Sequence, residues 1–161
     1  MHARELLAAA SACAAAMAAQ AQTPQVNPAC ERLLPVALVG RVAGELKAAL
    51  IPRDPHVGAG GNCNYSADPS APRKAVMLLA DINENASHAD FARYSGQGRQ
   101  QAIAGLGDEA VGSETIITAR KGRLLVVVSS FFKVDLRTGT ATAYFTRAQL
   151  IDLVRQVLAT G

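Results

Sequence analysis

The chain has 161 residues and a formal net charge of +3, from 16 lysines and arginines against 13 aspartates and glutamates. This length accommodates one ordinary domain. The basic residues are scattered along the sequence, which excludes the dense basic stripe of a nucleic-acid-binding protein, so nucleic acid is not an expected partner.

Residues 1–21 predict a secretory signal peptide. A short start with one arginine precedes the alanine-rich run LLAAASACAAAMAA, and residues 19–21 (AQA) provide the small side chains that a signal peptidase recognises. The run is shorter than the roughly 20 apolar residues of a membrane span, so no stable membrane insertion is expected after cleavage. Lipoprotein processing at Cys13 is disfavoured because alanine, not leucine, stands three residues before it. The signal indicates a bacterial protein that is soluble in the periplasm or secreted.

Removal of the signal leaves two cysteines, Cys30 and Cys63. Two cysteines in a small exported protein predict one structural disulfide. The alternative is a thiol nucleophile or a metal-binding pair, which an oxidising compartment disfavours.

The N-terminal half predicts short helices and two strands. After a polar, flexible lead at 22–28, the single folded domain is expected to span 29–161, with a second helix that has Pro35 at its first position. A loop rich in proline and glycine precedes a short strand that begins at Cys63. Residues 74–82 predict a strand covered on both faces, because their apolar run is almost continuous.

The next segment predicts a helix and a hairpin. Ser87 and Asp90 have the spacing of a capping box at the start of a helix. Apolar runs at 115–119 and 124–128 flank the sequence RKGR, which is typical of a β-hairpin, and the second run predicts the central strand of the sheet.

The last helix has the clearest pattern. Thr146 and Gln149 form a second capping box, and an apolar stripe follows at helical spacing. Together the elements predict an α+β fold, in which N-terminal and C-terminal helices pack against an antiparallel sheet. Four aromatic residues near this helix could line a pocket but are expected in the core: Phe131, Phe132, Tyr144 and Phe145.

The motif GLGDEAVG, which begins at Gly105, resembles a phosphate-binding loop. Its third glycine is wrongly spaced for a dinucleotide fingerprint, and strand residues follow where a helix should begin. We therefore expect Gly105 and Gly107 to form a backbone turn with Asp108 and Glu109 at its exposed rim, and no cofactor is expected.

The sequence DINEN matches the first three ligand positions of a calcium loop, at Asp81, Asn83 and Asn85. Alanines stand at position 86, where the loop needs glycine, and at position 92, where it needs glutamate. No metal site is expected here.

Only two histidines follow the signal, His56 and His88. A Ser-His-Asp site is recognised by geometry rather than by sequence position, so a small periplasmic hydrolase that uses either histidine stays open. The nucleophile-elbow motif G-x-S-x-G is missing from the sequence. A surface position for each histidine is the simpler interpretation.

The order of these motifs resembles a family of small exported bacterial domains of unknown function, found as secreted lipoproteins or periplasmic proteins. The likeness rests on ACERLLP, then CNY, GLGDEA, a strand, KG, a valine-rich strand and the final helix. It implies an α+β fold and a bond between the two cysteines. It implies no catalytic residues.

These observations favour a non-enzymatic periplasmic domain that binds an envelope protein or a small-molecule ligand. Binding residues concentrate on loops carried by a rigid sheet, so the candidate surface lies where the 51–62 loop meets the glycine turn. An envelope inhibitor or assembly protein is the remaining alternative. The candidate surface residues are Arg53, His56, Tyr65 and Asp108.

Overall fold

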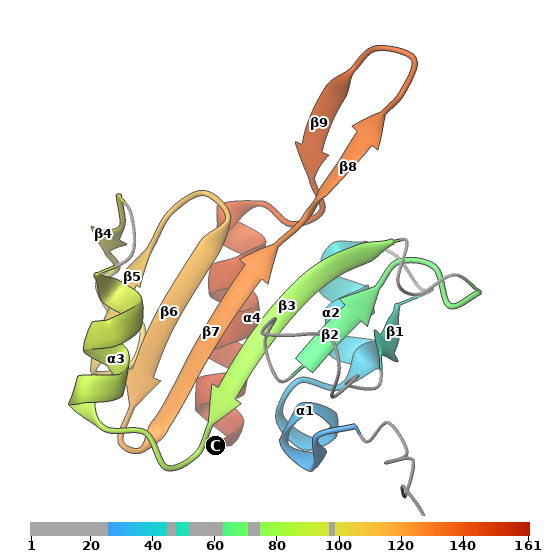
Figure 1. Cartoon of the computed structure of the whole chain (residues 1–161). Coiled ribbons are helices and arrows are strands. Elements are labelled where there is room, and N and C mark those ends of the chain that lie inside the picture. Colours follow the sequence, from blue (N-terminus) through green and yellow to red (C-terminus); the bar gives the residue numbers. More distant parts are fainter. Residues whose placement is uncertain (1–25, 45–47, 52–62, 71–74, 97–98) are drawn as a thin grey trace, which may run out of the picture.

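The structure of the protein is a computed structural model that describes residues 26–44, 48–51, 63–70, 75–96 and 99–161. These residues form an α+β fold with a seven-stranded antiparallel sheet, a two-stranded sheet and four helices, which confirms the predicted fold class (Figure 1). The predicted signal peptide and most of the lead lie outside the described residues. In chain order the elements are α1 (Pro28–Leu33), α2 (Val36–Ala43), β1 (Ala49–Ile51), β2 (Cys63–Ser66), β3 (Val76–Asn83), α3 (His88–Ser95), β4 (Gln101–Ala102), β5 (Glu109–Gly112), β6 (Ile116–Lys121), β7 (Leu124–Ser130), β8 (Phe132–Asp135), β9 (Thr140–Ala143) and α4 (Arg147–Thr160).

Strand β7 is the centre of the larger sheet, whose order is β1-β2-β3-β7-β6-β5-β4. Its side chains alternate between the two faces of the sheet, and all five from Leu124 to Val128 are buried. Both faces are therefore covered at the centre, and the prediction that LLVVV is the central strand is confirmed. The predicted strand at 74–82 is β3, which pairs with β7 from Leu78 to Asn83.

Helices cover the two faces of the sheet unequally (Figure 1). Helix α4 packs against β6 and β7, and its buried stripe joins α1 and α2 in the main core. The side-chain amide of Gln149 donates a 2.7 Å hydrogen bond to the Val42 carbonyl, which ties α4 to α2. On the opposite face α3 packs against β6 and β7, where Phe91 joins Leu125 and Val127 in a smaller core.

The helix starts follow their sequence signals closely. Both capping boxes are present, with Ser87 bonded to Asp90 and Thr146 bonded to Gln149. Pro35 is the residue before α2 rather than its first residue, a difference of one position. The folded chain also begins earlier than residue 29, because Pro28 opens α1 and the Asn27 side chain accepts a hydrogen bond from the helix backbone.

The disulfide between Cys30 and Cys63 is present and joins α1 to β2. Both cysteines are buried, and their Cα atoms lie 5.5 Å apart. The bond closes a segment of 33 residues, and the chain-entropy model assigns such a closure about 4 kcal/mol of stabilisation. It holds the N-terminal helices against the sheet.

The connection from β7 to α4 leaves the body of the domain. Strands β8 and β9 form a hairpin that projects beyond the larger sheet (Figure 1). This departure overturns one sequence expectation. Phe145 is buried and Tyr144 packs against the core, but Phe131 and Phe132 are exposed because they lie where the chain leaves the sheet and enters the hairpin.

Candidate interaction surface

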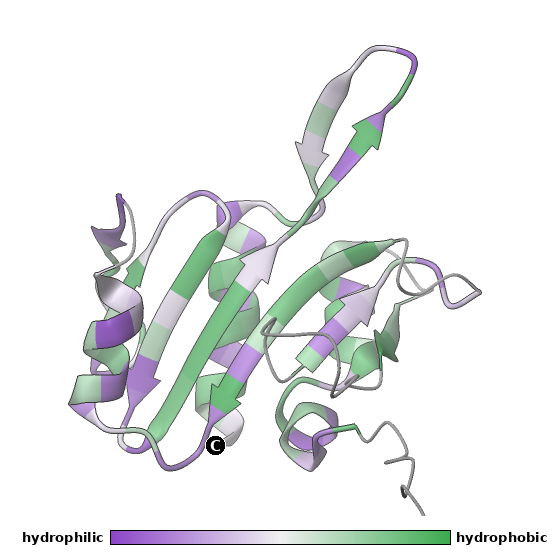
Figure 2. Ribbon diagram, in the orientation of Figure 1, coloured by the Kyte–Doolittle hydropathy of each residue, from purple (hydrophilic) through white to green (hydrophobic). Residues whose placement is uncertain are grey.

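The β8–β9 hairpin has one apolar and one polar face. In β8, Phe132 and Val134 share one face, and Lys133 and Asp135 share the other, because side chains alternate along a strand. The register places an alanine of β9 opposite each apolar residue and a threonine opposite each charged one. Figure 2 shows the resulting alternation of hydropathy along β8.

The apolar face of this hairpin is uncovered. Among the described residues, the exposed large hydrophobic side chains all lie within 131–136. Their exposed fractions are 40% for Phe131, 54% for Phe132, 55% for Val134 and 94% for Leu136. Phe132 and Val134 lie on the apolar face and Leu136 follows at the turn, whereas Phe131 lies at the base with the parity of Lys133. Single exposed apolar residues are ordinary, but a group of this kind is typical of an interaction surface.

The base of the hairpin is fixed to the domain by hydrogen bonds. The Phe131 N–H donates to the Met77 carbonyl of β3 at 3.0 Å, and the Phe131 carbonyl accepts from the Tyr144 N–H at 2.9 Å. The buried hydroxyl of Ser130 accepts a 3.0 Å bond from the Phe145 N–H. The point where the chain leaves the sheet is therefore a defined structure.

The tip and the polar face supply the hairpin's other internal contacts. The Asp135 carboxylate accepts from the Arg137 N–H at 2.8 Å, and the Asp135 carbonyl accepts from the Gly139 N–H at 2.7 Å. The Lys133 ammonium lies 5.5 Å from the centre of the Tyr144 ring. The hairpin's shape is set by its backbone and polar side chains, which leaves the apolar face free to bind.

The size of the uncovered patch is considerable for so small a protein. A phenylalanine side chain buries about 150–250 Å² when fully covered, so Phe132 at its exposure presents roughly 100 Å² on the apolar face. Val134 and Leu136 bring the patch into the range of about 300–600 Å² that is often functional in monomeric proteins. An isolated two-stranded hairpin is also marginally stable in water. A partner that covers the patch would stabilise the hairpin as well.

The sequence contained a usable signal for this hairpin. FKVD and TATA both alternate with a period of two, and the segment between Asp135 and Gly139 has the composition of a turn. Phe131 and Phe132 were nevertheless expected in the core, because aromatic residues beside a valine-rich strand usually pack there.

Asp108, a predicted surface residue, is exposed but holds two turns together. Its carboxylate accepts a 2.7 Å hydrogen bond from the Gly122 N–H, and its own N–H donates to the Arg120 carbonyl at 2.8 Å. Gly105 and Gly107 have φ values of +71° and +72°, so the predicted backbone turn is confirmed. Open depressions flank Asp108, beside Lys121.

Tyr65 does not belong to a surface, which corrects its place among the candidate residues. Its side chain is fully buried, and its hydroxyl donates to the Leu34 carbonyl at 2.5 Å. Burial also raises the pKa of Tyr65, so the hydroxyl keeps its proton and its role as a donor. The other two candidates, Arg53 and His56, lie outside the described residues, so the predicted meeting of the 51–62 loop with the glycine turn stays a prediction.

His88 lies in a charged cluster at the start of α3. Its Nδ1 lies 2.6 Å from one carboxylate oxygen of Glu109, and the Arg120 guanidinium donates to the other at 3.1 Å. The hydrogen bond from Arg120, followed by that from His88, lowers the pKa of Glu109. The carboxylate is therefore charged at neutral pH and held on both sides.

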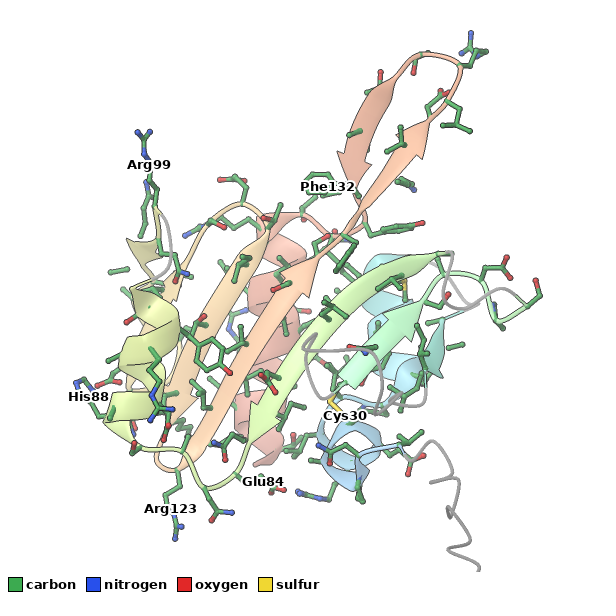
Figure 3. All side chains as sticks on the ribbon, viewed as in Figure 1. Cys30, Glu84, His88, Arg99, Arg123 and Phe132 are labelled. Atoms are coloured by element: carbon green, nitrogen blue, oxygen red, sulfur yellow. A yellow bond between two sulfur atoms is a disulfide. The ribbon has the colours of Figure 1, made fainter. Side chains whose placement is uncertain are left out.

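This cluster contains only part of a hydrolytic site. The His88 side chain is 73% exposed, and no hydroxyl or thiol of the described residues bonds to its imidazole. Figure 3 shows His88 and Phe132 at opposite ends of the sheet, so the cluster and the apolar hairpin are separate features. Within the described ranges, no group of three or more histidine, cysteine or acidic side chains is arranged to hold a metal ion.

No helix in the described part of the chain is both long and apolar enough to cross a membrane. No family model, curated protein or solved structure matches the chain. The resemblance to small exported bacterial domains therefore stays a prediction, and functional inference rests on the surface of the molecule.

Proposed function

We propose that the protein is a non-enzymatic, exported interaction domain that binds a partner protein through the apolar face of its β8–β9 hairpin. The observation that carries this proposal is the collection of all the exposed large hydrophobic side chains of the described residues on one projecting hairpin. The hairpin has a rigid base, because β7 precedes it and α4 follows it in the sequence, and both of these elements are anchored in the core.

The shape of the surface favours a protein over a small molecule. Small-molecule sites are concave and enclose most of the ligand, whereas a two-stranded hairpin presents flat faces and open edges. A protein partner can cover a flat apolar face and can add a strand to a free edge. The flat hairpin offers no such enclosure, which disfavours a small-molecule ligand at this surface.

Two observations support the proposed location in the periplasm or outside the cell. The buried Cys30–Cys63 disulfide belongs to the type of bond that persists in oxidising compartments. The sequence of residues 1–21 has the pattern of a cleavable signal.

The mass of the protein recovered from a bacterial periplasm tests this location: we expect a chain that begins at Gln22 and is two hydrogens lighter than its reduced form. A mass that retains residues 1–21 would contradict export with cleavage.

Site-specific photo-crosslinking in the expressing cell tests the interaction. A photoreactive amino acid at position 134 should give a discrete protein adduct, because Val134 lies on the apolar face. The matched control is position 142, where Thr142 lies one strand away on the polar face. We expect no comparable adduct there, and we expect the adduct from position 134 to disappear with Phe132→Ser. Equal labelling from both positions, or none from position 134, would overturn the proposal.

A further inference from the structure

We propose that the partner of the hairpin is a second copy of this chain, joined through antiparallel pairing of the two β8 strands about a twofold axis at Val134. This inference rests on the proposed function and names its partner. It is carried by three features of β8: its free backbone edge, the order of its charges and the order of its apolar residues.

The free edge of β8 is known from its pairing with β9. The Phe131 and Asp135 carbonyls both accept hydrogen bonds from the β9 side of the hairpin, at 2.9 Å and 2.7 Å. Backbone groups in an antiparallel strand alternate in direction, so Phe132 and Val134 direct their N–H and C=O groups away from β9. The two-stranded sheet has no further strand on that side within the described residues.

A twofold axis at Val134 makes this edge complementary to itself. Two Val134 residues, one from each copy, would exchange both backbone hydrogen bonds, and Phe132 would lie beside the second copy's Leu136, which follows β8 at the start of the turn. Within β8, Phe132 and Val134 are the residues whose backbone N–H and C=O groups point away from β9. The register therefore uses the free donors and acceptors of both edges.

The charges of β8 match in the same register. Lys133 of one copy would lie opposite Asp135 of the other, and the symmetry repeats the pair. These positions form non-hydrogen-bonded pairs, in which cross-strand side chains are closest. Opposite charges would meet on the polar face, while Phe132 and the second copy's Leu136 would meet on the apolar face.

The expected dimer is weak. Only the four residues of β8 pair, with Leu136 of the adjoining turn beside them, and the apolar patch on each copy lies in the range of about 300–600 Å². Such an interface is at the low end of specific protein complexes, below about 1,200 Å² in total. We therefore expect the dimer to form at micromolar or higher protein concentration.

Charge reversal tests the register. In sedimentation equilibrium of the full mature chain, Lys133→Asp and Asp135→Lys should each weaken dimerisation roughly tenfold or more, because two attractive pairs become repulsive. A mixture of the two variants should recover dimers, since each acidic pair then faces a basic pair. The double variant, with the two charges exchanged, should also recover them. Failure of the mixture and of the double variant to recover would overturn the register.

Cysteine crosslinking gives a second, independent test. Val134→Cys should form an intermolecular disulfide, because the two Cα atoms would lie about 5.5 Å apart in the hydrogen-bonded pair. Ala141→Cys is the matched control: it lies on the same apolar face but on β9, so the two copies of position 141 would be separated by three strand spacings, about 14 Å. Equal crosslinking at both positions would overturn the proposal.

The outcomes separate this inference from the proposed function. A photo-crosslinked adduct whose mass is that of two copies supports both. An adduct with a different protein, together with a purified chain that stays monomeric at millimolar concentration, overturns the second-copy inference and leaves the hairpin as an interaction surface. A dimer that persists unchanged in all the β8 variants overturns the inference, because another surface must then form it.

Discussion

Substitution of Gly107 by alanine should destabilise the protein far more than substitution of Gly105. Both glycines have positive φ values, +71° at Gly105 and +72° at Gly107, which any other residue adopts with strain. Their surroundings differ. A Cβ atom at Gly107 would lie 2.5 Å from the Arg120 carbonyl oxygen, whereas a Cβ at Gly105 would have no atom within 4 Å.

The magnitudes follow from these two environments. The left-handed conformation costs alanine about 1–2 kcal/mol, partly offset by the lower entropy of the unfolded alanine chain, so Gly105→Ala should lose about 1 kcal/mol. At Gly107 the same strain is joined by a clash with backbone. The Arg120 carbonyl already accepts a 2.8 Å hydrogen bond from the Asp108 N–H, so its displacement weakens the start of the β5–β6 pairing. Overpacking adds about 1–3 kcal/mol, for a total loss of about 3 kcal/mol or more.

Urea denaturation followed by circular dichroism measures both losses, with the disulfide intact in each variant. Thermal unfolding followed in the same way gives the corresponding change in Tm. At about 3–4 °C per kcal/mol for a domain of this size, Gly105→Ala should lower Tm by about 3–4 °C and Gly107→Ala by about 10 °C. Gly105 is the matched control, since it carries the backbone strain without the clash. Equal losses in the two variants would refute the steric reasoning, and with it the view that GLGDEA is a structural turn.

Three further changes test the energetics of the fold. Reduction of the Cys30–Cys63 bond should lower the free energy of unfolding by about 4 kcal/mol, which urea denaturation with and without a reductant measures. A loss under about 1 kcal/mol would mean that the segment closed by the disulfide is already ordered in the unfolded chain. Thr118→Val should raise the free energy of unfolding by about 1 kcal/mol, because the Thr118 hydroxyl is buried without a hydrogen-bond partner among the described residues. A decrease would show that the hydroxyl has a hydrogen-bond partner in solution. The pKa of Glu109 is lower in the folded chain than its unfolded value of 4.5. The stability that the charged Glu109 carboxylate contributes is therefore fully present above pH 4.5 and is lost as the pH falls through the folded-state pKa. Glu109→Gln should therefore show a smaller drop in stability between about pH 6 and about pH 3, and an unchanged drop would contradict the role of the Arg120 hydrogen bond.

Local patterns in the sequence were sufficient for the central elements. Five consecutive apolar residues at 124–128 require a strand that is covered on both faces, and the structure has helices on both faces of β7. The capping boxes at Ser87 and Thr146 fixed the helix starts, because each uses only residues within one turn. Once the predicted signal is removed, Cys30 and Cys63 have only each other as disulfide partners in the chain.

Contacts between distant segments were harder to predict. His88 meets Glu109 of β5 because α3 packs over the neighbouring strands β6 and β7, a placement that no local pattern encodes. Tyr65 could have been placed from period two alone, since it shares a strand face with Cys63, whose disulfide lies in the core. The composition of the sequence CNY gave no reason to treat the tyrosine as a surface residue.

The hairpin was missed for a different physical reason. Alternation of apolar and polar residues at 132–135 shows that one face of the strand is suited to burial, but it does not say what buries it. A strand at the edge of the main sheet and a strand in a projecting hairpin have the same pattern. A contact at Ser130 distinguishes the projecting hairpin from an edge strand. The Ser130 hydroxyl accepts a hydrogen bond from the Phe145 N–H, which brings the start of α4 back beside the end of β7.

An uncovered apolar strand with a free edge also risks unlimited association, and the composition of the hairpin limits it. Pairing through β8 would use up its free edge. The order of Lys133 and Asp135 permits the twofold register and penalises a slip of two residues, which would bring two lysines or two aspartates opposite each other. The outer edges of the resulting four-stranded sheet would be the two β9 strands, which carry only threonine and alanine. These small side chains offer little apolar area for a further copy. A closed pair rather than a filament is therefore the expected end of association, because an isologous interface uses the same surface of both copies and leaves none of it for a third.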